Sequence, residues 1–142
     1  MPATKPGGVE ASGSREASFD LARRDPRHPR VDQLKRGDVV VIALAGDYGK
    51  PRPALIIQSD LFNETHASVT VVPLTSTLVD APIFRLTVEP SPTNGLRSLS
   101  QLMIDKVTTV SRTRIAQSIG RLEDDLLLRV SRALALWVGI AT

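Results

Sequence analysis

The segment Lys50-Pro51-Arg52-Pro53-Ala54-Leu55-Ile56-Ile57-Gln58-Ser59 opens an apolar run with one arginine held between two prolines. Pro51 fixes its own φ, and Pro53 restricts Arg52 to extended backbone. Because neither proline can donate a backbone hydrogen bond, we expect a strand that begins sharply here and covers residues 52–58. A guanidinium on so stiff a backbone suits a phosphate ligand, since its planar donors match phosphate oxygens.

Similar short runs recur along the chain and predict a mainly β domain. Runs rich in Val, Ile, Leu and Thr, separated by Gly, Pro, Asn and Ser, are typical of short strands joined by turns. We expect strands at residues 38–44, 52–58, 68–74, 83–88, 99–104 and 106–110. Small strands in series, followed by a late helix, favour a small, strongly bent antiparallel barrel.

The pattern changes after Gly120, where apolar residues recur at helical spacing. We expect a terminal helix that packs Trp137 in the core and ends at Gly139. An acidic cluster at the helix start is interpreted as stabilising the helix dipole rather than holding a metal ion. The apolar face consists of Leu126, Leu127, Val130, Leu134, Trp137 and Val138, and the acidic cluster of Glu123, Asp124 and Asp125.

Length and composition limit the classes of protein to consider. A chain of 142 residues with 42% hydrophobic content has room for one domain with one core. The absence of cysteine excludes disulfides, thiolate zinc sites and cysteine nucleophiles, and it fits a reducing cytoplasm. No apolar run reaches membrane-spanning length, and the N-terminus lacks a signal-peptide core, so we expect a cytoplasmic protein without a membrane partner.

The net charge of +3 is concentrated near the N-terminus. Residues 1–36 hold eight Lys and Arg against five Asp and Glu, whereas the remainder holds ten of each. Few large apolar side chains occur there, so we expect residues 1–34 to be a disordered or weakly ordered basic tail and residues 35–142 to fold. The basic cluster at residues 23–30 is either a solvated linker or a source of nonspecific phosphate affinity.

Four motifs in the folded part together resemble the MazF/PemK toxins over about residues 35–140. They are Arg36-Gly37-Asp38-Val39, Arg52-Pro53-Ala54-Leu55, Val71-Val72-Pro73-Leu74-Thr75-Ser76, and Asp105-Lys106-Val107-Thr108-Thr109-Val110 followed by Ile119-Gly120-Arg121-Leu122.

The resemblance implies an SH3-like barrel that acts as a homodimeric, sequence-selective endoribonuclease toxin of a type II toxin–antitoxin system. It implies single-stranded RNA (mRNA) as substrate, a cognate antitoxin as inhibitor, and no metal or other cofactor. Attack by the ribose 2′-hydroxyl would leave a 2′,3′-cyclic phosphate and a 5′-hydroxyl.

The resemblance also assigns catalytic roles to Arg52, Thr75 and Asp105. Such cleavage needs an acceptor for the 2′-hydroxyl proton, positive charge at the phosphorane and a proton for the leaving oxygen. Arg52 suits the phosphorane, since a guanidinium pKa above about 12 makes it a poor proton acceptor. Thr75 could donate to a nonbridging oxygen. Asp105 could accept the proton or a base-edge hydrogen bond; alternatively it pairs with Arg52 or opens a turn.

We expect RNA-binding roles for Tyr48, Lys50 and Ser76. Tyr48 could stack on a base or cover the barrel end, Lys50 could contact phosphate, and Ser76 adjoins Thr75 in its motif. Two departures from the family pattern bear on activity. The loop at residues 45–51 is short, and Met103 stands where some relatives carry a basic residue.

Two alternative functions remain open from the sequence. Gln58-Ser59-Asp60, Val72-Pro73-Leu74 and Trp137-Val138-Gly139-Ile140 are similar to the CcdB family, which poisons DNA gyrase without catalysis through a closing tryptophan, glycine and isoleucine. Val138 interrupts that trio here. The third hypothesis is an inactive barrel that only binds RNA or an antitoxin.

Overall fold

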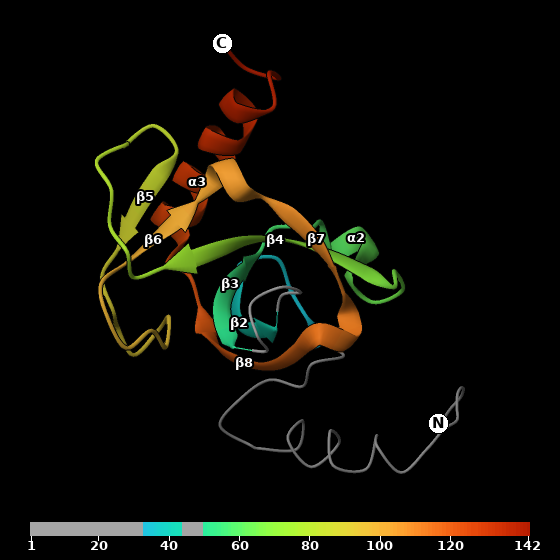
Figure 1. Cartoon of the computed structure of the whole chain (residues 1–142). Helices are drawn as coiled ribbons and strands as arrows, with labels where there is room; N and C mark the ends of the chain where they lie inside the picture. The colour runs from blue at the N-terminus through green and yellow to red at the C-terminus, as the bar shows by residue number, and fades with distance from the viewer. Residues whose placement is uncertain (1–32, 44–49) are drawn as a thin grey trace, which may run out of the picture.

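The computed structural model describes residues 33–43 and 50–142; the expected tail and Tyr48 therefore lie outside the described residues. Within this part the helical elements are α2 (Asp60–Asn63), η2 (Ile104–Lys106), η3 (Arg112–Arg114) and α3 (Asp124–Trp137) (Figure 1). The strands are β2 (Asp38–Ala43), β3 (Pro51–Ile56), β4 (Ser68–Thr75), β5 (Arg85–Val88), β6 (Ser100–Met103), β7 (Thr108–Ser111) and β8 (Ile115–Arg121).

The six predicted strands and the terminal helix are all present, with boundaries that differ by a few residues. The main error of the sequence prediction is β8, which it missed. The pairing of β8 with β2 shifts register between Val39 and Val40 and again between Val41 and Ile42. Such bulges break the alternation of inward and outward side chains, and this alternation is the signal by which a strand is recognised in a sequence.

The strands form an antiparallel sheet in the order β5-β6-β4-β3-β2-β8, with β7 paired to β4. The long strand β4 organises the sheet, because one of its edges pairs with β7 through Val71 and with β6 through Leu74. Figure 1 shows β4, β3, β2, β8 and β7 curving around a common centre. The strongly bent antiparallel sheet is thus confirmed. Among the described strands no ladder joins β7 to β8, so closure of a barrel stays a prediction.

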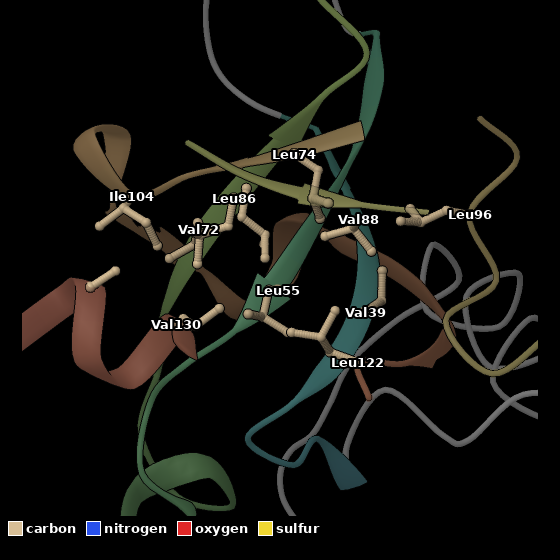
Figure 2. Packing of buried hydrophobic residues seen from close by; sticks show 12 residues of the cluster. Val39, Leu55, Val72, Leu74, Leu86, Val88, Leu96, Ile104, Leu122 and Val130 are labelled. Atoms are coloured by element: carbon tan, nitrogen blue, oxygen red, sulfur yellow. The ribbon is translucent and has the colours of Figure 1, made fainter. Parts of the chain in front are cut away.

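Apolar side chains are buried on both faces of this sheet, in two clusters rather than the single expected core. Neighbouring residues of one strand go to opposite clusters: Val39 and Leu55 to the first, Val40 and Ile56 to the second. The first cluster includes Val130 of α3, as Figure 2 shows. Burial on both faces explains why the strands read as continuous apolar runs.

Helix α3 covers the first cluster with its middle turns, but its end extends beyond the sheet. Val130 and Ala133 are buried, and Gly139 at φ 83° follows the last turn as expected for a helix end. The prediction that Trp137 packs in the core is wrong, because its side chain is 49% exposed and contacts only the ring of Phe84 among the described aromatic residues, at 5.7 Å between centroids. No helix in the described ranges has the length and apolar content needed to cross a bilayer.

The Arg-Gly-Asp-Val motif ties the start of β2 to three other parts of the structure. The Arg36 guanidinium donates to the Ile57 carbonyl and to Ser131 Oγ of α3, at 3.1 and 2.8 Å. Asp38 is buried, accepts from the Lys35 amide at 2.8 Å, and lies 3.5 Å from the Arg121 guanidinium. Burial is the largest influence on this carboxyl and raises the pKa of Asp38. These contacts therefore connect the start of β2 to the residue after β3, to α3 and to β8.

Candidate functional site

The adjacent ends of β3 and β4 open onto a surface groove of about 790 Å³. Its lining is drawn from β2, β3, β4, β8 and the segment that leads from β5 to β6. We call it the Arg52 groove. The polar side chains that line it include Lys50, Arg52, Thr75, Ser76, Arg97 and Gln117.

Strand register brings Arg52 and Thr75 together at one end of this groove. Ala54 of β3 lies opposite Pro73 of β4, and continuing this antiparallel register by two residues sets Arg52 opposite Thr75. Both side chains are partly buried and both line the groove. Thr75 Oγ1 accepts a hydrogen bond from the Thr77 amide at 3.1 Å, which leaves the hydroxyl hydrogen to be donated to a ligand.

The groove is cationic. Lys50, Arg52 and Arg97 all line it, and none of the described residues lining it is acidic. Concave surfaces lined by one sign of charge concentrate ligands of the opposite sign. The arrangement therefore favours an anionic ligand with more than one charge along its length.

Four of the predicted site residues, Lys50, Arg52, Thr75 and Ser76, line the groove, and Arg97, which the sequence did not single out, lines it as well. The exposed Arg97 follows the Asn94-Gly95 pair by two residues, and such a pair in a sequence indicates a turn. A cation that adjoins a turn carries no strand-end motif like that of Arg52, so its place in the groove emerges only from the fold. Tyr48, the remaining predicted RNA-binding residue, lies outside the described residues.

Asp105 lies in η2 and is not among the residues that line the groove. Its carboxylate receives two hydrogen bonds from the Arg85 guanidinium, at 2.8 and 3.1 Å. The hydrogen bond from Arg85 lowers the pKa of Asp105. A carboxylate stabilised in its ionised form is a weaker proton acceptor. The pairing with Arg85 therefore makes Asp105 less suited to the catalytic role that the resemblance implied.

The family model of the PemK-like, MazF-like toxins of type II toxin–antitoxin systems matches residues 35–138. The chain belongs to this family. The MazF/PemK resemblance of its four motifs is thereby confirmed.

Individual relatives agree with this assignment. The toxin is 51% identical, over 109 residues, to the probable endoribonuclease MazF of Mycolicibacterium smegmatis. The aligned region covers 76% of this chain and 99% of the relative. This similarity classes the toxin with the endoribonuclease toxins.

Solved structures show that the toxin has a MazF-like fold. An endoribonuclease in complex with its cognate antitoxin from a mycobacterial species matches with a TM-score of 0.63 and 23% identity, over 77% of this chain and 98% of that chain. The Mycobacterium tuberculosis toxin MazF-mt6 matches with a TM-score of 0.64 and 22% identity, over 74% and 99%.

Proposed function

We propose that this toxin cleaves single-stranded RNA, and mRNA in particular, in the Arg52 groove, selectively for sequence and without a metal ion. The observation that carries the proposal is the meeting of Arg52 and Thr75 at the paired ends of β3 and β4, in a groove lined by three cations. A cationic groove suits an extended polyanion, and single-stranded nucleic acid is bound in grooves of this kind.

In this reaction the ribose 2′-oxygen bonds to phosphorus and the bond from phosphorus to the 5′-oxygen breaks. The proton lost from the 2′-hydroxyl is balanced by one gained on the leaving 5′-oxygen, so the products are a 2′,3′-cyclic phosphate and a 5′-hydroxyl. Arg52 stabilises the negative charge that grows on the phosphorane, and Thr75 donates its hydroxyl hydrogen to a nonbridging oxygen. Donors held on strand ends need little rearrangement as this charge develops.

Asp105 takes part in this scheme only if it is released from Arg85. While both hydrogen bonds from Arg85 persist, its carboxylate serves better to fix η2 than to accept a proton. An Asp105→Asn variant keeps the size of the side chain and removes its basicity. If Asp105 is the proton acceptor, this variant loses most of its activity, together with the rise of the cleavage rate that the parent shows at acid pH as this low-pKa carboxyl ionises.

The test of the proposal is an end-mapping experiment. The pure toxin is incubated with single-stranded RNA in EDTA, and the product ends are analysed for cyclic phosphate and 5′-hydroxyl. Arg52→Ala should lower the cleavage rate by about 10²- to 10³-fold, the usual cost of losing one electrostatic donor. Arg132→Ala serves as the matched control, because it removes the same charge from an exposed position on α3.

Full activity of Arg52→Ala would refute the assignment, and absence of cleavage by the parent would refute the proposed function. Gyrase supercoiling is measured in parallel, because one observation favours the CcdB-like alternative. Trp137 and Ile140 at the end of α3 are 49% and 83% exposed, as a surface that contacts another protein would require. Inhibition of gyrase without RNA cleavage would select this alternative.

An antitoxin that silences this groove would carry an extended segment with carboxylates, which mimic the charges of the RNA backbone. We also propose that the toxin is a homodimer. The cluster of exposed apolar residues at the end of α3 supports an interface, and it consists of Leu136, Trp137, Val138 and Ile140. Size-exclusion chromatography with light scattering distinguishes a dimer from a monomer of 15.4 kDa.

A further inference from the structure

The segment from Gly95 to Ser100 forms one wall of the Arg52 groove, beside the parts of the lining that β2, β3, β4 and β8 contribute. It begins against Ile119 of β8 and leads into β6, which pairs with β4. It therefore crosses the end of the sheet from β8 towards β4. Arg97 is the charged residue of this wall and is exposed.

A buried asparagine fixes the start of this wall. Asn94 is 0% exposed. Its Oδ1 accepts hydrogen bonds from the amides of Ser91 and Leu96 at 3.1 and 3.0 Å, and its Nδ2 donates to the Glu89 carbonyl at 2.9 Å. A buried side chain with its hydrogen bonds satisfied on several sides holds the backbone around it in one conformation.

The same asparagine is linked to the start of α3. Ser91 Oγ donates to Glu123 at 2.6 Å and accepts from the Asn94 amide at 3.1 Å. Glu123 is the residue that precedes α3. We call these three residues, Ser91, Asn94 and Glu123, the Asn94 clamp. The clamp joins the wall to the helix that covers the core.

Close packing of backbone against β8 adds to the clamp. A Cβ atom on Gly95, at φ 73°, would lie 2.1 Å from the Ile119 carbonyl oxygen. A Cβ atom on Gly120 would lie 2.5 Å from the Thr93 carbonyl oxygen. The wall and β8 therefore contact each other backbone to backbone at both glycines. Arg97 lies only two residues after Gly95.

We propose that Arg97 binds a second RNA phosphate in the Arg52 groove, beside the one that is cleaved, and that the Asn94 clamp positions it. The inference rests on the proposed function and deepens it. Arg97 and Arg52 are carried by different walls of one groove, so a strand that crosses the groove would meet both cations. Because the backbone of the wall is fixed before RNA arrives, little backbone conformational entropy is lost when Arg97 makes this contact.

The test measures RNA binding as a function of salt. The probe is a single-stranded RNA cut by the parent toxin, with a 2′-deoxy sugar at the mapped cleavage position so that the nucleophile is missing. For single strands, each phosphate neutralised contributes about 0.7 to the slope of log K against log salt. Arg97→Ala should lower the slope by about 0.7 and weaken binding by about five- to tenfold near 50 mM salt.

Arg132→Ala is again the matched control and should leave the slope unchanged. On cleavable RNA, Arg97→Ala should raise KM with little change in kcat, whereas Arg52→Ala lowers kcat. A slope equal to that of the parent, or a loss confined to kcat, would overturn the phosphate site. If the parent cuts no RNA, the same titration with unmodified RNA still tests Arg97, so failure of cleavage and failure of the phosphate site are distinguishable.

The positioning role is tested by a double-mutant cycle between Ser91 and Arg97. Ser91→Ala removes the hydroxyl that bridges Asn94 and Glu123 and leaves only the longer direct hydrogen bonds from Asn94 Nδ2 to Glu123, at 3.3 and 3.5 Å. It should weaken RNA binding by a few-fold when Arg97 is present and have no effect in the Arg97→Ala background. An equal loss in both backgrounds would show that Ser91 acts on stability alone and would overturn the clamp's role.

Discussion

Replacement of Gly95 by alanine tests the contact between the groove wall and β8. The substitution carries two costs. A φ of 73° is unfavourable for alanine by about 1 kcal/mol relative to glycine. The new Cβ would also lie 2.1 Å from the Ile119 carbonyl oxygen, a backbone atom of β8, and overpacking of this kind costs about 1–3 kcal/mol. Gly95→Ala should therefore lower the free energy of unfolding by about 2–4 kcal/mol.

Gly139 provides the control for the backbone component. It has a similar φ of 83°, but a Cβ atom there would meet nothing within 4 Å. Gly139→Ala should cost only about 1 kcal/mol. Urea unfolding followed by far-UV circular dichroism gives both values, and their difference isolates the steric contribution. Equal losses for the two variants would refute the contact of the wall with β8, and with it the fixed placement of Arg97.

Three further predictions concern charged groups. Arg85→Ala should lower the free energy of unfolding by about 1–2 kcal/mol in urea titrations at neutral pH, because it strands the partly buried Asp105 carboxylate. The hydrogen bond from Arg85 lowers the pKa of Asp105, and the hydrogen bond from Ser91 lowers the pKa of Glu123. The stabilisation by these two carboxylates is therefore present above their unfolded pKa of about 4 and is lost as the pH falls through their folded pKa values. The fall of the unfolding midpoint at acid pH should be smaller in Glu123→Gln than in the parent. Burial raises the pKa of Asp38, so the stabilisation by its protonated carboxyl is lost as the pH rises through the folded pKa. Asp38→Asn should therefore be at least as stable as the parent at pH 7, and it should gain no stability over the parent below about pH 4. A clear loss of stability at pH 7 in thermal melts would contradict this reasoning.

The sequence predicted those parts of the fold whose burial is uniform. Residues such as Val40 and Ile56 lie in strands with both faces covered, so they read as unbroken apolar runs whatever their register. Arg52 could be singled out because two prolines fix its backbone, a constraint that is local and visible in the sequence. Thr75 depended on the family resemblance, since a threonine at the end of a strand carries no distinctive pattern.

The rest depended on contacts between residues far apart in the chain. Trp137 fits the apolar face of α3 by its spacing, but spacing cannot show that the helix runs past the edge of the sheet. Asp105 lies in the predicted motif, but its pairing with Arg85 arises from the register of β5 against β6. Arg97 becomes part of the groove only because Asn94 and Gly95 attach its segment to β8.

The Asn94 clamp suggests a route to redesign. The segment between Gly95 and Ser100 is held at both ends. Gly95 packs against β8, and Ser100 begins β6, which pairs with β4. Exposed side chains between these moorings, such as Arg97 and Ser98, can be exchanged without disturbing either anchor. The segment is therefore a suitable place to randomise residues in a library of variants. Variants with altered preference for an oligonucleotide could be selected from it while the rest of the fold stays unchanged.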